Sequence, residues 1–146
     1  MSLLELVLAA SLVAVMAGLA LPVAHTMERR ARELELRGTL RQMRRAIDAY
    51  RFTVQAVPTA HKDVTAEDWP KELEVLVEGI DLGLAKETKA KFLRHIPRDP
   101  LTGKTEWGLR SSKQDPDDTL WDGVNVFDVY SLAEGKALDG TLYSEW

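Results

Sequence analysis

Few residues in this chain of 146 amino acids have the types and spacing of a catalytic centre. The sequence contains no cysteine, no Gly-x-Ser-x-Gly nucleophile motif and no phosphate-binding loop. Its three histidines, His25, His61 and His95, stand singly, without the close pairing that a zinc site needs, and we expect them on the surface. The sequence therefore predicts that the protein is not an enzyme.

Carboxylates offer the one other set of chemically useful side chains. Four aspartates gather in the polar segment 111–123, and they are Asp115, Asp117, Asp118 and Asp122. Calcium takes six to eight oxygen ligands, many of them carboxylates, so such a cluster is a candidate calcium site. A long acidic segment between two strands is more often an exposed, solvated loop, and we favour that interpretation.

The most informative single carboxylate is Glu5. It is the only strongly polar side chain in an apolar run that extends from Met1 to Ala24. A helix of that length reaches about the thickness of a bilayer core, so residues 1–25 are predicted to form a transmembrane helix. A signal peptide is the alternative, but here the basic residues follow the apolar run, and residues 22–25 make a poor cleavage site.

An ionised carboxylate inside an apolar helix is unfavourable unless it finds a cation or reaches the headgroup level. The nearest cation in sequence is the α-amino group of Met1, from the same chain or from a neighbouring copy. A position at the headgroup level is the alternative for Glu5. Farther along, Gly18 and Pro22 are expected to kink or loosen the helix, because glycine lowers helix propensity and proline removes a backbone donor.

Residues 26–54 predict a second, amphipathic half of the same helix. Its apolar positions follow a 4-3-4-3-4 spacing, and they are Leu36, Leu40, Met43, Ile47, Tyr50 and Val54. Such a stripe is typical of a helix that packs on a sheet. The opposite face carries Arg29, Arg30, Arg32, Arg37, Arg41, Arg44 and Arg45.

Part of this basic charge is expected to be compensated along the helix, through Glu28 with Arg32 and Glu33 with Arg37. The remaining arginines have four candidate surroundings: solvent, lipid headgroups, nucleic acid and acidic surfaces of neighbouring subunits. Nucleic acid is disfavoured as the partner of the whole domain, because the net charge is −4 and the pI is about 5.4.

Beyond the long helix the sequence predicts a small α+β domain. Residues 66–93 are expected to form short helices, the first capped within Thr65–Asp68 and carrying Leu73 and Leu76 on its buried face. Residues 94–146 are expected to form strands and loops. Alternation around Trp107–Arg110 and Phe127–Tyr130 predicts two strands with one covered face each. The fold class is therefore a long helix packed on a small antiparallel C-terminal sheet.

The N-terminal residues resemble a known superfamily. An apolar first residue with Glu at the fifth position of a long apolar helix, as in Met1 and Glu5, resembles the mature type IV pilin-like proteins. Residues 92–104, 107–111 and 126–132 are similar to sheet segments of the major pseudopilin of type II secretion systems, and the expected fold is pilin-like. The resemblance implies leader cleavage before Met1 by a prepilin peptidase, N-methylation of Met1, and pairing of Glu5 with the amino terminus of an adjacent subunit.

The resemblance also implies partners and a location. We expect a helical homo-oligomeric filament that works with minor pseudopilins and an inner-membrane assembly platform to drive protein export. The positive-inside rule would place the basic residues, and with them domain 26–146, in the cytoplasm. The family implies the opposite: a single-pass inner-membrane protein with a periplasmic domain, which then joins a periplasmic or cell-surface filament. We follow the family.

One cofactor is implied by the resemblance. The loop 132–140 stands where the family binds calcium, and the carbonyl of Leu132 and the side chain of Asp139 are the expected ligands. The loop lacks the family's run of acids and carries Lys136 instead, so an ordinary turn is the alternative. Alternative functions are a type IV pilus or DNA-uptake pilin, a minor tip subunit that binds a partner through its arginine-rich face, and a simple membrane-anchored domain.

Overall fold

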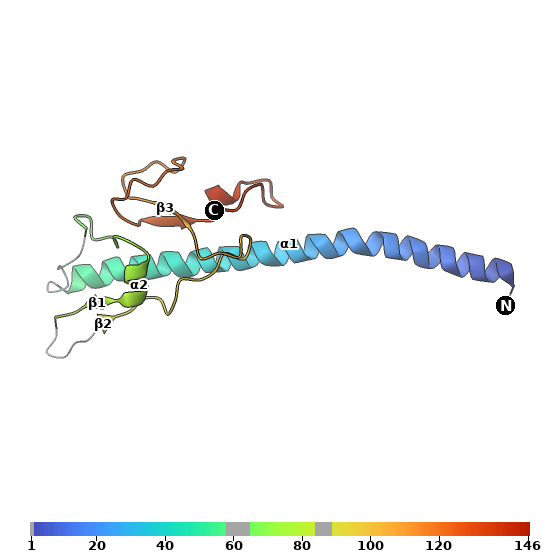
Figure 1. Ribbon diagram of the computed structural model, residues 1–146, viewed down its shortest axis with the longest axis horizontal. Coiled ribbons are helices and arrows are strands. Elements are labelled where there is room, and N and C mark those ends of the chain that lie inside the picture. The colour runs from blue at the N-terminus through green and yellow to red at the C-terminus, as the bar shows by residue number, and fades with distance from the viewer. Residues whose placement is uncertain (1, 58–64, 84–88) are drawn as a thin grey trace.

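The computed structural model describes residues 2–57, 65–83 and 89–146, with the side chains of 18–23 left out. One helix, α1 (Leu3–Ala56), dominates the structure, and everything else lies along its C-terminal half (Figure 1). Two small antiparallel sheets make up the strand content of the described residues. The expected α+β class, with a long N-terminal helix and a small C-terminal antiparallel sheet, is confirmed at this level of detail.

The first part of α1, from Leu3 to Met16, lies apart from the other elements of the described chain (Figure 1). Its apolar side chains are exposed, and the larger ones are Leu3, Leu4, Leu6, Val7, Leu8, Leu12, Val13, Val15 and Met16. In the described residues, no helical stretch combines the length and the apolar character needed to cross a membrane. The helix continues through Gly18 and Pro22, whose side chains lie outside the described residues, so the expected kink stays a prediction.

The C-terminal half of α1 supplies the centre of the core. All six residues of the predicted stripe are buried, and none is more than 1% exposed: Leu36, Leu40, Met43, Ile47, Tyr50 and Val54. Each such side chain contributes roughly 1.5–3 kcal/mol to folding when it leaves water. Tyr50 makes an edge-to-face contact with Phe92, with 5.5 Å between the ring centroids. The spacing of the apolar residues therefore predicted the buried face correctly.

The sheet that lies against this face consists of β3 (Gly108–Arg110) and β4 (Asp128–Tyr130). The two strands are antiparallel, with Leu109 opposite Val129. Both were predicted from alternation, and the segment between them forms the expected loop. Phe127 was wrongly predicted to share the buried face with Val129. It is 46% exposed and packs edge-to-face on Trp69, while Val126 is fully buried in its place.

The prediction of short helices over 66–93 is confirmed only in part. Within the described residues only α2 (Glu74–Glu78) forms, and it ends at Gly79, whose φ of +81° suits glycine. Strand β1 (Ile80–Asp81) follows and pairs with β2 (Lys89–Ala90), so the last part of the range predicted to be helical is extended instead, and residues 84–88 lie outside the described residues. Thr65 does not cap a helix, because its hydroxyl donates to the carbonyl of Trp69 at 2.7 Å.

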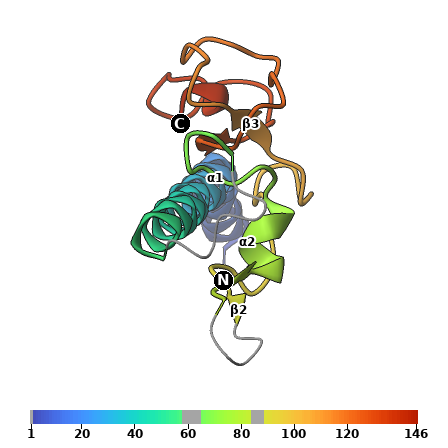
Figure 2. The same ribbon diagram turned by 90° about the vertical axis from the view of Figure 1, so that its left-hand side faces the viewer.

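The chain ends with the 3₁₀ helix η2 (Tyr143–Glu145), which is drawn in red beside α1. Seen along α1, the segments lie on two sides of the helix (Figure 2). Strand β3 and the C-terminal segments lie above α1, and α2 with β2 lies below it. The other elements thus pack around the C-terminal half of the long helix, which we call its clasped half, and leave its N-terminal segment exposed, which we call its bare half.

Candidate interaction site

Glu5 is used within its own helix. The Glu5 Oε2 accepts a hydrogen bond from the backbone N–H of Ser2 at 3.3 Å, and the Ser2 hydroxyl oxygen accepts one from the N–H of Leu4 at 3.3 Å. This reciprocal capping box satisfies two of the donors that a helix leaves unpaired at its start. Met1 lies outside the described residues, so the pairing of Glu5 with a neighbouring amino terminus stays a prediction.

The arginines of α1 that were predicted to share one face divide into three groups. Three arginines are tied to C-terminal segments, and they are Arg29, Arg37 and Arg44. Arg32 pairs along the helix with Glu28 at 2.6 Å, as predicted. Arg30, Arg41 and Arg45 make no ion pair or hydrogen bond with any described residue. The predicted face is thus only partly solvated.

Arg44 makes the most extensive contact between α1 and the sheet. Its Nε and Nη2 donate to the two carboxylate oxygens of Asp128 at 2.6 and 3.2 Å. Its Nη2 also donates to the backbone carbonyls of Val129 at 3.2 Å and Trp146 at 2.7 Å. A two-point guanidinium–carboxylate contact fixes orientation as well as distance. Arg44 therefore sets how β4 and the C-terminus sit on α1.

Arg29 and Glu33 hold the C-terminal segment at the start of the clasped region. The buried Glu33 Oε1 accepts hydrogen bonds from the Tyr143 hydroxyl at 2.9 Å and from the N–H of Leu138 at 3.0 Å. Arg29 lies 3.4 Å from Glu33 and donates to the carbonyl of Lys136. The contact with Tyr143 raises the pKa of Arg29 above its ordinary value. The predicted Glu33–Arg37 pair is wrong, because both side chains bind elsewhere.

Arg37 binds Asp139, the residue expected to hold calcium. The Arg37 Nη2 lies 2.6 Å from Asp139 Oδ2, and the guanidinium carbon stacks 4.0 Å from the centre of the Trp146 ring. The other carboxylate oxygen accepts from the hydroxyl of Thr141 at 2.6 Å and from its N–H at 3.0 Å. The Thr141 hydroxyl, then its N–H, and then Arg37 lower the pKa of Asp139 below the ordinary aspartate value.

This arrangement is a poor fit to calcium. Both oxygens of Asp139 already accept from protein donors, and Arg37 places a positive charge where the ion would bind. Calcium needs six to eight oxygens free to point at it. Leu132, the other expected ligand, has an apolar side chain and could contribute only its backbone carbonyl. The loop 132–140 suits an arginine better than a divalent cation.

The second calcium candidate, the aspartate cluster in loop 111–123, is also tied into its own loop. Asp122 accepts from the Ser111 hydroxyl at 2.6 Å and from the N–H of Val124 at 3.0 Å. These hydrogen bonds, that of Ser111 foremost, lower the pKa of Asp122. Across the part of the chain that the structure describes, no three acidic, histidine or cysteine side chains converge as a metal site would require.

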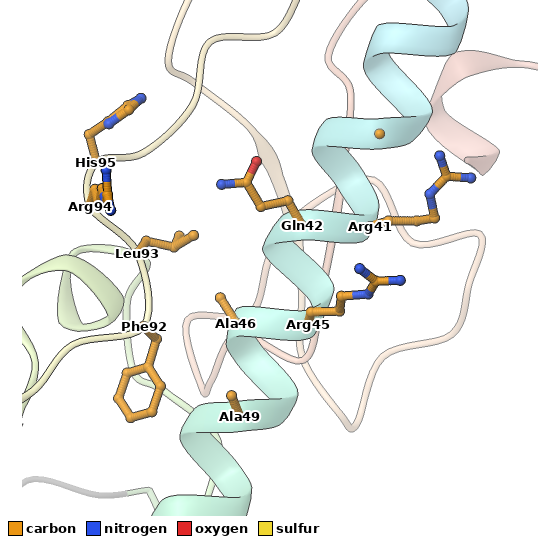
Figure 3. Close-up of a pocket in the computed structure, with 10 residues that line it drawn as sticks. Arg41, Gln42, Arg45, Ala46, Ala49, Phe92, Leu93, Arg94 and His95 are labelled. Carbon is orange, nitrogen blue, oxygen red and sulfur yellow. The ribbon is translucent and has the colours of Figure 1, made fainter.

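A groove of about 760 Å³ lies along α1 on the side of β2. Its floor is the α1 surface formed by Gly38, Gln42, Ala46 and Ala49, and Phe92 and Leu93 form the facing wall. Figure 3 shows Arg41 and Arg45 on the far side of the helix, with Arg94 and His95 on the loop across from them. Three guanidinium groups and one imidazole thus border a floor of small residues.

The described residues that line this groove include no carboxylate. Arg94, like Arg41 and Arg45, has no ion-pair or hydrogen-bond partner within the described chain. Guanidinium groups bind carboxylate and phosphate through two N–H donors at once. Arginines without a partner in their own chain can bind such a group on another molecule. This arginine groove is therefore suited to recognise an anion.

The sequence predicted that the arginines share one face of the helix. It did not predict the arginine groove, nor the contacts of Arg29, Arg37 and Arg44 with the C-terminal segments. Arg44 follows Met43 and precedes Ile47, so it borders the buried stripe and could have been singled out as a residue at the edge of the core. The role of Arg94 depends on a loop that no periodic pattern predicts. Of the predicted site residues, Glu5 lies at the free end of α1 and Asp139 beside its clasped half, so the structure does not bring them together.

Comparisons of the chain with models of protein families, with curated proteins and with solved structures each find no match.

Proposed function

We propose that this chain is a structural subunit of a pseudopilus-type filament of a type II secretion-like system, held in the inner membrane by its N-terminal helix before assembly. The observation that carries the proposal is the bare half of α1. From Leu3 to Met16 it presents large apolar side chains that are 55–83% exposed, with no other part of the described chain against them. A surface of this kind needs a cover of lipid or of other helices.

The form of the molecule supports assembly as the use of this surface. One continuous helix carries the bare half and the clasped half, so a domain fixed to its C-terminal part would be carried on the outside of a bundle of N-terminal halves. Exchanging lipid for neighbouring helices brings little hydrophobic gain, so specific polar contacts must set the register. Glu5 is the carboxylate available for that role within the apolar half.

A filament subunit also requires a domain that keeps its position on the helix. The contacts of Arg29, Arg37 and Arg44 with the C-terminal segments serve this purpose. The DNA-binding alternative draws less support from the contacts, because Arg29 and Arg32, two of the arginines nearest the apolar half, already bind groups of the same chain.

The test compares two substitutions at Glu5. Glu5→Leu removes both the charge and the hydrogen-bonding group, whereas Glu5→Gln removes the charge and keeps an acceptor for the N–H of Ser2. The Gln variant therefore separates helix capping from charge pairing. We expect both variants to enter the membrane fraction, with filament yields reduced about tenfold or more, since each loses a charge-assisted contact in an apolar setting.

Two results would contradict the role assigned to Glu5, the first in part and the second completely. Wild-type filament yield from Glu5→Gln would reject the charge pair with a neighbouring amino terminus. Wild-type yield from both variants would reject any assembly role for Glu5.

A further inference from the structure

The charges of this chain are separated along its sequence. Residues 27–56 contain eight arginines and four acidic residues, whereas residues 65–146 contain seventeen acidic residues and ten lysines or arginines. The long helix is therefore basic and the segments after it are acidic. Two copies of such a chain attract each other when the helix of one faces an acidic segment of the other.

The arginine groove is the basic part of this pair of surfaces. Its cationic border is formed by Arg41, Arg45 and Arg94, which are free of carboxylate partners in the described chain. Arg41 lies sixteen residues beyond the predicted end of the membrane segment at residue 25, which is about 24 Å along a helix. That distance takes the groove away from lipid headgroups and into the region where neighbouring subunits would lie.

The acidic part is the loop 115–120, which we call the acidic loop. It contains Asp115, Asp117 and Asp118 and ends at Leu120, which is 85% exposed. Asp117 has no ion-pair or hydrogen-bond partner among the described residues. An exposed leucine beside three carboxylates matches a groove that has an apolar wall at Phe92 and a cationic border.

The acidic loop keeps a defined shape. The Asp118 Oδ2 accepts from the N–H of Asp115 at 3.0 Å, and the N–H of Asp118 donates to the carbonyl of Asp115 at 3.1 Å. The side-chain amide of Gln114 donates to the carbonyl of Leu120 at 2.5 Å. A loop that is already ordered loses less entropy on binding than a flexible one.

The acidic loop cannot reach the groove of its own molecule. It belongs to the segment between β3 and β4, above α1, while the groove is bordered by the chain that follows β2, below α1 (Figures 1 and 2). A contact between the two must therefore join different copies. Because the two surfaces differ, the contact can repeat head-to-tail from one copy to the next, which is the kind of contact that an open helical filament requires.

We propose that the acidic loop of one copy docks in the arginine groove of the next copy. The inference deepens the proposed function and rests on it, because it names a contact between neighbouring subunits. In this contact the carboxylates of Asp115, Asp117 and Asp118 meet the guanidinium groups of Arg41, Arg45 and Arg94. The side chain of Leu120 lies against Phe92.

Site-specific cross-linking tests the contact directly, because the wild-type chain has no cysteine. Full-length chains carrying Asp117→Cys are mixed with chains carrying Arg45→Cys, in detergent and in the producing membrane, and treated with a short bismaleimide. We expect a cross-linked heterodimer. The matched control replaces Asp117→Cys by Glu74→Cys, an exposed acid on α2, and is expected to give little product. Equal yields from both pairs would overturn the proposal.

A charge exchange adds a second readout. One chain carries Leu120→Cys in its acidic loop and the other carries Phe92→Cys in its groove. Reversing the charges on one side only is expected to lower their cross-linking by about tenfold, because several exposed ion pairs become repulsive. The groove side is reversed by Arg41→Glu with Arg45→Glu, and the loop side by Asp115→Lys with Asp117→Lys. Mixing the two charge-reversed chains is expected to restore the cross-linking. All four charge substitutions lie at exposed positions, and circular dichroism of each variant checks that it folds. Failure of the mixture to restore cross-linking would contradict the docking.

The outcomes separate this inference from the proposed function. Wild-type filaments that form without the cross-link would refute the docking and leave the filament role intact. Cross-linked pairs without filaments would support the docking and refute the filament role. Salt-sensitive binding of duplex DNA that is lost in the Arg41→Glu, Arg45→Glu chain, with no effect of the acidic-loop substitutions, would overturn the docking in favour of a nucleic-acid site.

Discussion

Replacing Arg44 with alanine tests how the domain is held on the helix. The substitution removes four hydrogen bonds, two to Asp128 and one each to the carbonyls of Val129 and Trp146. The side chains of Arg44 and Asp128 are 37% and 27% exposed, so water replaces part of what is lost. We count about 1 kcal/mol for the carboxylate contact and about 1–2 kcal/mol for the two carbonyls, which gives a destabilisation of about 2–3 kcal/mol.

The assay is thermal unfolding of the full-length chain in detergent micelles, followed by near-ultraviolet circular dichroism. This signal comes from tryptophan and tyrosine side chains, and all four tryptophans lie beyond α1. A loss of about 2–3 kcal/mol is expected to lower the unfolding midpoint by roughly 8–12 °C in a domain of this size.

The matched control is Arg45→Ala, the neighbouring arginine that is exposed and has no partner in the described chain. Its expected effect is within about 0.5 kcal/mol. Arg44→Lys, which keeps the charge but not the two-point contact, should fall between the two. Equal midpoints for Arg44→Ala and Arg45→Ala would refute the claim that Arg44 fixes the sheet on the helix.

Two further predictions concern packing and pH. A Cβ on Gly108 would clash with the buried ring of Tyr130, so Gly108→Ala is expected to destabilise the domain by about 1–3 kcal/mol. Gly38→Ala on α1, where an added Cβ meets nothing within 4 Å, should stabilise the domain by about 0.5–1 kcal/mol. If urea unfolding showed that both substitutions change the free energy of unfolding in the same direction, this packing would be contradicted. The pKa values of Asp122 and Asp139 are lowered in the fold, so their contribution to stability is complete above the ordinary aspartate value of 3.8 and is lost as the pH falls below it. Urea unfolding over a range from neutral to strongly acidic pH should therefore show a weaker acid dependence for Asp122→Asn with Asp139→Asn than for the wild-type chain, and an identical acid dependence would reject these assignments.

The sequence predicted the parts of the fold that depend on periodicity. The six-residue stripe on α1 follows from the regular spacing of apolar residues, and the structure confirms it. The strands around Leu109 and Val129 also form, but burial does not alternate along the second one, because Phe127 is exposed while Val129 and Tyr130 are both buried. Of the short helices predicted over 66–93, one forms around Leu76 and Val77 and ends at Gly79, and its length was overestimated because Leu73, Leu76 and Val77 suit a longer helix locally. The chain turns into the β1–β2 pair after Gly79, so only five residues stay helical there.

The site was harder to predict because its contacts join residues far apart in sequence. The i,i+4 rule predicted Glu33 with Arg37, but Tyr143 and Asp139, more than 100 residues away, bind these side chains instead. The partner of Arg44, Asp128, is on a strand whose register no local pattern specifies. The i,i+4 rule predicted the pair of Glu28 and Arg32 correctly, because no residue from a distant part of the described chain binds either side chain.

Electron microscopy with helical reconstruction tests the central claim most directly. The sample is material sheared from producing cells, or assembled from the purified full-length chain. We expect filaments in which the bare half of α1, from Leu3 to Met16, is covered by the same segment of other copies, with Glu5 close to a neighbouring amino terminus. Monomers that keep an intact α1 under conditions of assembly, or filaments with this segment outside their core, would contradict the claim.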